Sequence, residues 1–245
     1  MATQGQEVVL PGLLGEEVNG PNNSIGWCDY TWNPVVGCKN GCWYCYGRRI
    51  RKRFHPEIPY EQITNYDERL QEPLKLKKPS RIFVGSMTDL FAEWMPKYNV
   101  QNVLDIAQFC PQHTFQFLTK NPKRYFEFIM TGNCWLGVTI TNSQEAKNIF
   151  DQWNLDMQHL KYISFEPLLG DIELPEPRYI IDSVLRRIKW IIIGAMTGPG
   201  SQKCQPKTEW IQNILTQADK YKIPVFMKGN LQKVWKGKLR REFPK

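Results

Sequence analysis

Three cysteines lie within eight residues of the chain, and their spacing is typical of a metal-binding loop. Cys38, Cys42 and Cys45 form a Cys-x3-Cys-x2-Cys pattern, whereas the other four cysteines are scattered. Thiolates are soft ligands that select iron–sulfur clusters or zinc. Three of them can hold three irons of a [4Fe–4S] cluster, which leaves the fourth iron for an external ligand. A closed zinc site needs a fourth protein ligand, for which Cys28 and His55 are the candidates.

The compartment expected for this chain agrees with a metal site. The first residues lack the basic region and apolar core of a signal peptide, and no apolar run approaches the length of a membrane span. We therefore expect a cytoplasmic protein with no membrane contact. Thiols stay reduced in that compartment, so a clustered set of cysteines favours metal binding over a disulfide framework.

Polar residues also follow most of the apolar runs that read as strands. A single polar residue after a strand is more often a cap or a turn residue, so the prediction depends on such residues following strand after strand. In a (β/α) barrel the chemistry takes place at the C-terminal ends of the strands, and we expect these residues to share one site there. They are Ser86, Asp89, Lys120, Thr139, Thr141, Asn142, Glu166 and Lys228.

The elements that must position these residues alternate along the chain. We predict strands at 31–37, 81–85, 114–119, 135–140, 162–165, 190–194 and 224–227, and helices at 42–54, 99–110, 122–130, 143–155 and 208–221, with Asn121 and Asn142 as helix caps. Repeated strand–helix alternation implies parallel pairing with right-handed crossovers.

The predicted fold class is α/β, a single-domain partial (β/α) barrel of about six parallel strands. It spans residues 25–229, after a flexible lead-in at 1–24 and before a basic C-terminal tail at 230–245. A flat doubly wound sheet is the alternative, although no dinucleotide-binding fingerprint supports it.

Positive charge is concentrated in two places. The chain carries 32 Lys and Arg against 24 Asp and Glu, a net charge of +8, and its last eighteen residues contain seven basic residues and one acidic residue. The second run is Arg48, Arg49, Arg51, Lys52 and Arg53. Localised positive charge is typical of proteins that bind DNA or RNA, and a solvated helix face with a frayed terminus is the other interpretation.

The cysteine pattern after the first strand, with Tyr44 before the last cysteine, resembles the radical S-adenosylmethionine superfamily. Further segments look like a poorly characterised phage-type, radical-SAM-like family with three cysteines: Gly26-Trp27, Thr31-Trp-Asn-Pro34, Phe83-Val-Gly-Ser-Met-Thr-Asp-Leu-Phe91, Leu118-Thr-Lys-Asn-Pro122, Leu136-Gly-Val138 and Ser164-Phe-Glu-Pro-Leu-Leu-Gly170. The similarity covers nearly the whole predicted barrel. One departure is Ala195-Met-Thr-Gly198, which lacks the carboxylate that such a family carries after the sixth strand.

The resemblance implies a [4Fe–4S] cluster on Cys38, Cys42 and Cys45 and S-adenosylmethionine chelating its open iron. Reduction by an electron donor such as flavodoxin or ferredoxin would give a 5′-deoxyadenosyl radical that abstracts hydrogen. Ser86 and Asp89 would contact the methionyl amino group, Thr139, Thr141 and Asn142 the ribose or carboxylate, and Glu166 the ribose or substrate.

The leading functional hypothesis is therefore a radical enzyme that modifies or repairs nucleic acid or a nucleotide, with catalytic residues not identified. A radical enzyme acting on a peptide or small metabolite is the second hypothesis. The third is a zinc-stabilised nucleic-acid-binding module without catalysis.

Overall fold

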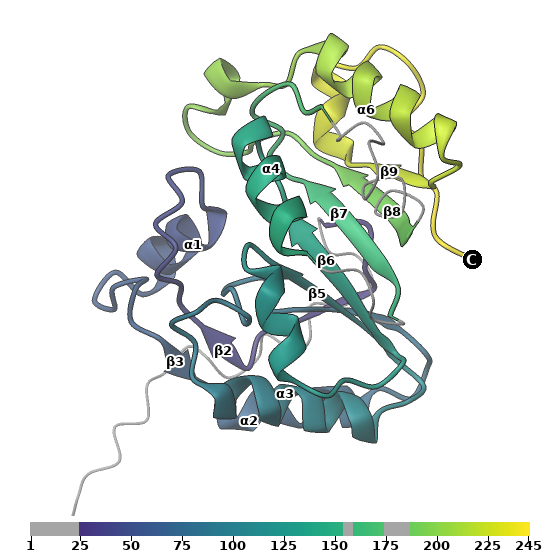
Figure 1. The fold of residues 1–245 in the computed structure, drawn as a ribbon. Coiled ribbons are helices and arrows are strands. Elements are labelled where there is room, and N and C mark those ends of the chain that lie inside the picture. Colours follow the sequence, from purple (N-terminus) through teal and green to yellow (C-terminus); the bar gives the residue numbers. More distant parts are fainter. Residues whose placement is uncertain (1–24, 154–158, 174–186) are drawn as a thin grey trace, which may run out of the picture.

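A sheet of seven parallel strands forms the centre of the molecule in the computed structural model, which describes residues 25–153, 159–173 and 187–245 (Figure 1). The strands are β1 (Tyr30–Trp32), β4 (Arg81–Val84), β5 (Thr114–Thr119), β6 (Cys134–Thr139), β7 (Lys161–Phe165), β8 (Ile188–Ile193) and β9 (Val225–Met227). They lie side by side in chain order, and every neighbouring pair is parallel. The predicted α/β class and partial barrel are confirmed, with a half-barrel of seven strands.

Helices cover the outer face of this half-barrel. Among the described residues the α-helices are α1 (Tyr46–Phe54), α2 (Asp67–Leu70), α3 (Lys97–Phe109), α4 (Ser143–Gln152) and α6 (Thr208–Lys220). Alternate residues of the strands pack against them, as Phe115 and Phe117 do with Val103 of α3, and Ile191 and Ile193 do with Ile211 of α6. Within the described residues, none of the helices combines the length and the apolar character that a membrane span requires.

Aromatic side chains fill the inner face of the half-barrel. Trp27, Phe83, Tyr162, Trp190 and Phe226 form one buried cluster, in which the rings of Trp27 and Phe83 are 4.6 Å apart. This packing makes the strands a rigid support for the loops at their ends.

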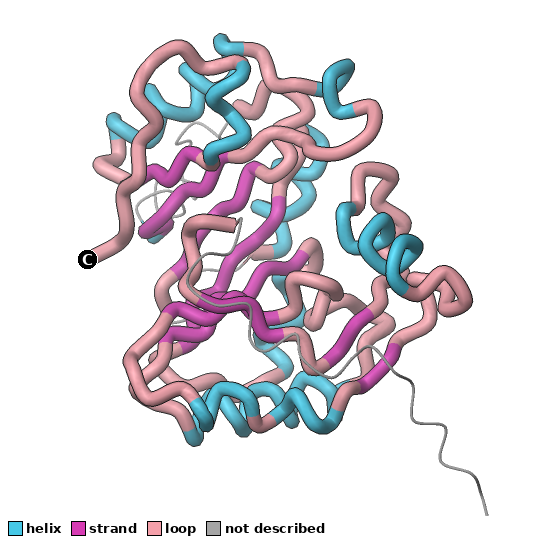
Figure 2. Tube along the Cα trace, turned by 180° about the vertical axis from the view of Figure 1, so that it is seen from behind, coloured by secondary structure: helices cyan, strands magenta, loops and turns pink. Residues whose placement is uncertain are grey.

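The C-terminal segment packs against this cluster. The Phe243 ring lies 5.4 Å from the rings of both Trp190 and Phe226, and the Arg81 guanidinium stacks on it at 4.1 Å. The Trp190 Nε1 donates to the Glu242 carbonyl at 2.8 Å. Phe243 thus contacts residues of three strands, β4, β8 and β9. Figure 2 shows the C-terminal end of the chain beside the strands.

The prediction of one continuous first strand at 31–37 is wrong, because two short strands lie there. The strand breaks at Asn33-Pro34, because proline has no N–H for the sheet ladder. The chain then forms β2 (Val35–Val36), which pairs with β3 (Thr64–Asn65) in a small antiparallel sheet that the sequence did not indicate.

Two predicted helices also differ. The helix expected at 42–54 begins at Tyr46, because the residues before it form the cysteine turn, and the helix expected at 122–130 is a 3-10 helix, Pro122–Glu127. Asn121 does not cap it; its side chain donates to the Phe91 carbonyl at 3.2 Å. The cap at Asn142 is confirmed. That helix ends at Gln152, and the predicted last two residues, 154 and 155, lie outside the described residues, as does the lead-in at 1–24.

Candidate functional site

The parallel sheet brings the predicted site residues to one edge. Asp89 follows β4, Lys120 follows β5, Thr139 ends β6, Glu166 follows β7 and Lys228 follows β9. The cysteines lie between β2 and α1 at this same edge, where Gly37 donates its N–H to the Met87 carbonyl beyond β4 at 3.1 Å. The C-terminal edge of the half-barrel is therefore the candidate site.

The start of the cysteine loop is bound tightly to its neighbours. The Cys38 N–H donates to the Tyr60 carbonyl at 2.8 Å, and the Thr88 hydroxyl donates to the Gly37 carbonyl at 2.6 Å. Gly37 has φ +113, and a Cβ there would clash with the backbone of Gln62, so glycine is required at this position. The backbone of Cys38 is thus fixed by two other segments.

The end of the loop is the start of α1. Cys45 is the N-cap, and its Sγ accepts from the Arg48 N–H at 3.5 Å. Cys45 is therefore positioned by the helix that it begins.

The three thiols are free and half-buried. Burial, together with the negative charges of Asp89, Cys45 and Cys42, raises the pKa of Cys38 to about 12, against a hydrogen bond from the backbone of Asn40. Three neighbouring thiolates are costly without a bound cation, and a cluster supplies one. The donor set fits an iron–sulfur cluster.

A site for a single metal ion and a site for a cluster differ in how their ligands are arranged. In the part of the chain that the structure describes, no three His, Cys, Asp or Glu side chains converge on one point that could hold a metal ion. A [4Fe–4S] cluster does not need such convergence, because each thiolate binds a different iron. Of the two candidate fourth zinc ligands, Cys28 packs in the inner aromatic cluster and His55 lies at the far end of α1, 3.5 Å from Glu57.

Asp89 is nine-tenths buried and both its carboxylate oxygens accept hydrogen bonds. Oδ1 accepts from the Thr119 hydroxyl at 2.7 Å, and Oδ2 accepts from the Lys120 N–H at 3.1 Å and from the Asn40 amide at 2.9 Å. Burial raises the pKa of Asp89 despite these bonds. The carboxylate thus joins the cysteine loop to the end of β5, and its predicted contact with a cofactor stays a prediction.

Lys120 forms a second polar group with α4. Its Nζ donates to Glu145 at 2.7 Å and lies 5.7 Å from the centre of the Tyr44 ring, within the cysteine loop. The N–H and hydroxyl of Thr141 both donate to Glu145 at 2.8 Å, and Asn142 caps the helix. The predicted cofactor residues Thr141 and Asn142 therefore also hold the start of α4.

Glu166 and Lys228 form an ion pair across the end of the sheet, with 26% and 13% of their side chains exposed. A Cβ on Gly194, at the end of β8, would lie 3.1 Å from both side chains, so glycine leaves room for the pair. The Ser86 hydroxyl donates to Asn33 at 3.1 Å, and its carbonyl accepts from the Tyr46 hydroxyl. Thr139 remains half-buried at the end of β6.

The predicted basic run is divided by its environment. Arg51 is buried and donates to Tyr66 and Thr64 at 3.2 and 2.9 Å, and Arg48 pairs with Glu61. Arg49 packs over Gly198, at the turn that departs from the family pattern. Lys52 and Arg53 are exposed and available to a polyanion.

In the final segment, Arg240 pairs with Asp219 and Glu242, whereas Lys233, Lys236 and Lys238 are exposed.

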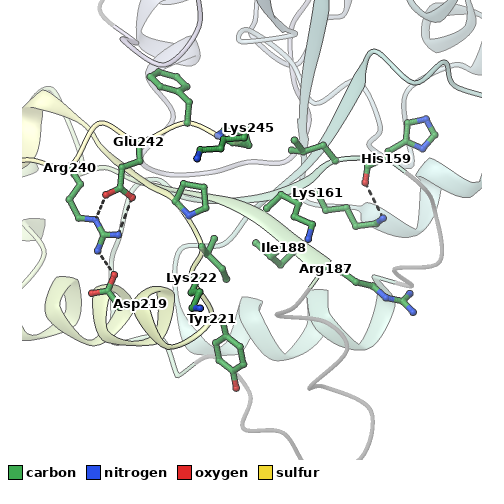
Figure 3. Close-up of a pocket in the computed structure, with 16 residues that line it drawn as sticks. His159, Lys161, Arg187, Ile188, Asp219, Tyr221, Lys222, Arg240, Glu242 and Lys245 are labelled. Atoms are coloured by element: carbon green, nitrogen blue, oxygen red, sulfur yellow. Dashed lines mark hydrogen bonds and ion pairs between the residues drawn. The ribbon is translucent and has the colours of Figure 1, made fainter.

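A cavity of about 1060 Å³ lies at the opposite, N-terminal edge of β7, β8 and β9. Basic residues line much of it, and Arg240 lies between Asp219 and Glu242 (Figure 3). It is separate from the cysteine site, because the two occupy opposite ends of the same strands.

Sequence reasoning missed several residues that shape the site, namely Asn33, Asn40, Tyr60, Trp94 and Glu145. Only Glu145 carried a signal: an Asn cap followed three residues later by Glu is a capping pattern. The others act across long sequence distances, as in the 2.9 Å hydrogen bond from Tyr60 to the Met87 carbonyl.

Comparisons with known proteins give a family and a fold. The sequence matches the family described as "Protein of unknown function (DUF5131)" over residues 22–241. No curated protein sequence matches. Spore photoproduct lyase complexed with dinucleoside spore photoproduct, and a mutant of that enzyme with the same dinucleoside, are similar in fold. For each, the TM-score is 0.53, the identity is 8%, and the alignment covers 82% of this chain and 76% of the other.

Proposed function

Because this chain belongs to the DUF5131 family, whose description assigns no activity, we propose from its site that it is a radical S-adenosylmethionine enzyme with a [4Fe–4S] cluster on Cys38, Cys42 and Cys45. The observation that carries the proposal is the position of these three free thiols on one loop at the C-terminal edge of a parallel half-barrel. The shared fold adds support, since spore photoproduct lyase is a radical S-adenosylmethionine enzyme.

The neighbouring strand ends provide the groups that would hold the second cofactor. Ser86, Thr139 and the Glu166–Lys228 pair lie along the same edge of the sheet as the cysteine loop. The pair of Lys120 and Glu145 lies there too, with Lys120 beside the Tyr44 ring. Carboxylates and hydroxyls bind ribose and ammonium groups, and lysines bind carboxylates. When bound, the cluster and S-adenosylmethionine would supply a radical that abstracts hydrogen from the substrate.

The protein itself would orient the reactants and exclude water. The inner aromatic cluster closes the floor of the half-barrel beneath the site, and Tyr44 and Tyr46 flank Cys45. A dry, preorganised pocket suits radical chemistry, because it prevents the reactive species from meeting solvent. A flavodoxin or ferredoxin would supply the electron.

For the substrate we propose a nucleic acid or nucleotide. Lys52 and Arg53 are exposed in the last turn of α1, the helix that begins at Cys45, so a phosphate backbone bound there would lie roughly 10 Å along the helix from the cysteine loop. The fold neighbour acts on a dinucleoside photoproduct, which is compatible with this class. A peptide or small metabolite remains the alternative.

The test is S-adenosylmethionine cleavage by protein reconstituted anaerobically with iron and sulfide. We expect 5′-deoxyadenosine after chemical reduction, with more of it when oligonucleotide is added, and none from the triple Cys38→Ala, Cys42→Ala, Cys45→Ala variant. Iron binding without 5′-deoxyadenosine would contradict the radical chemistry. Cleavage that oligonucleotides leave unchanged would favour the small-substrate alternative, and zinc without iron would support the structural metal site.

A further inference from the structure

Asn40 lies in the middle of the cysteine loop, and its side-chain amide is held at both ends. Its Nδ2 donates to Asp89 Oδ2 at 2.9 Å, and its Oδ1 accepts from the Trp94 indole N–H at 2.9 Å. Its backbone also hydrogen-bonds Cys38. One residue between the first two cysteines therefore connects the loop to the segment that follows β4.

Asp89 continues this connection to β5. The Thr119 hydroxyl and the Lys120 N–H donate to its two oxygens at 2.7 and 3.1 Å. These two donors at the end of β5 and the Asn40 amide of the cysteine loop thus meet on one buried carboxylate. Its position is fixed by β4 and β5, while Asn40 is on the exposed loop.

The loop needs such a contact. Gly41, next to Asn40, has φ +68 and open space around its Cα, so it gives the backbone freedom rather than restraint. Fixing the backbone of a free residue has a cost in conformational entropy, which a side-chain contact can offset. The backbone bonds of Gly37 and Cys38 and the cap at Cys45 hold only the two ends of the loop.

We propose that Asn40 and Asp89 form a latch that holds the cysteine loop in its ligand-presenting conformation before any cofactor binds. Asp89 is then a positioning residue that acts through Asn40, and not a direct ligand of S-adenosylmethionine. What the loop binds rests on the proposed function; the latch itself is a property of the protein without its cofactors.

Substitutions of Asp89 can separate the effect of its hydrogen bonds from the effect of its charge. Asp89→Asn keeps the latch, because the Thr119 hydroxyl can reverse and accept from the new amide nitrogen, while the amide oxygen still accepts from Lys120 and Asn40. Asp89→Ala and Asn40→Ala both remove it. Asn148→Ala, at an exposed position of α4, is the matched control.

Hydrogen exchange of the cofactor-free protein tests the latch. We expect amides of residues 38–45 to exchange about fivefold faster in Asn40→Ala, which corresponds to about 1 kcal/mol for one net hydrogen bond. Asp89→Ala should match or exceed this change, and Asp89→Asn and Asn148→Ala should equal the wild type. If Asp89→Ala does not fold, Asn40→Ala decides.

Two results would each overturn one part of the proposal. One part is the latch itself, which unchanged exchange in Asn40→Ala would overturn. The other is the positioning role of Asp89, which would be overturned by an Asp89→Asn variant with normal exchange but an S-adenosylmethionine affinity reduced tenfold or more, because the carboxylate would then be a direct ligand. A wild type that binds no iron would refute the proposed function and leave the exchange result standing, so the two failures are distinguishable.

Discussion

Glu166 and Lys228 follow β7 and β9, which lie on either side of β8, and their partly exposed side chains form an ion pair. Because both side chains keep some exposure to solvent, polar groups of a ligand at this edge of the sheet can replace part of the pair. The pair thus offers a charged partner to a ribose or carboxylate.

We predict that Glu166→Gln weakens S-adenosylmethionine binding about tenfold, because an amide accepts weaker hydrogen bonds than a carboxylate. Iron and sulfide content should stay normal, since Glu166 is not in the cysteine loop. Calorimetry on the cluster-loaded protein measures the affinity, with Glu68→Gln on α2 as the control. An unchanged affinity would place the cofactor elsewhere along the edge.

For individual residues, the sequence predicted the type of site better than it predicted which side chains contact one another. The cysteine spacing is local and could be read directly, as could the Asn142 cap. The partners of Asp89 could not, because Asn40 and Thr119 lie 49 and 30 residues away and meet it only after the strands pair.

The start of α4 depends on one carboxylate. Glu145 accepts from Lys120 and from both donors of Thr141. Burial alone would raise the pKa of Glu145, but the hydrogen bond and charge of Lys120 and the bonds from Thr141 outweigh it, so the pKa lies below its usual value of 4.5.

We predict that Glu145→Gln lowers the free energy of unfolding at pH 7 by about 1–2 kcal/mol, the range for a hydrogen-bonded charge. A lowered folded pKa gives stability that is present above the unfolded pKa and lost as pH falls through the folded value. The difference between wild type and variant should therefore shrink below pH 4.5. Urea unfolding at about pH 7 and about pH 3.5 measures it, and a difference independent of pH would contradict the assignment.

Element types followed from the apolar runs, whereas some boundaries did not. The seven strands of the main sheet are short, mostly apolar segments, which the pattern detects. After the break at Asn33-Pro34 the chain pairs with β3, a two-residue partner thirty residues later that no local pattern indicates. The Asn121 side chain likewise bonds the distant Phe91 carbonyl instead of capping the 3-10 helix that follows it.

The last residues complete the half-barrel rather than extending from it. Phe243 stacks with Trp190 and Phe226, and the N–H of Glu242 donates to the Val225 carbonyl at 3.0 Å. The division of the chain at residue 229 stays a prediction, but removal of everything after it would expose the inner aromatic cluster.

We predict that Phe243→Ala lowers the free energy of unfolding by about 2 kcal/mol, as expected for a partly buried aromatic residue. Lys245→Ala, two residues later and exposed, should have no effect. Chemical unfolding of both variants gives the comparison. A Phe243→Ala protein as stable as the wild type would mean that the segment does not support the fold.

Basic residues at the two edges of the sheet allow a test of whether nucleic acid binds at one edge or is attracted by net charge alone. Lys52 and Arg53 lie near the cysteine edge, whereas Lys77 and Lys78 precede β4 and lie toward the other edge. We predict that Lys52→Gln with Arg53→Gln weakens oligonucleotide binding and reduces the slope of log affinity against log salt by about 2, one for each phosphate that is no longer neutralised. Fluorescence anisotropy at several salt concentrations measures both quantities. An equal weakening in the Lys77→Gln, Lys78→Gln control would show that only net charge matters.

The central claim is that one loop at the C-terminal edge of the half-barrel holds a [4Fe–4S] cluster, and iron and sulfide content after anaerobic reconstitution tests it most directly. We predict about four irons and four sulfides per chain in the wild type and in Cys28→Ala. Single replacement of Cys38, Cys42 or Cys45 by Ala should remove most of both. Full iron and sulfide in the triple variant, or a loss in Cys28→Ala equal to that in Cys42→Ala, would contradict the assignment of these three ligands.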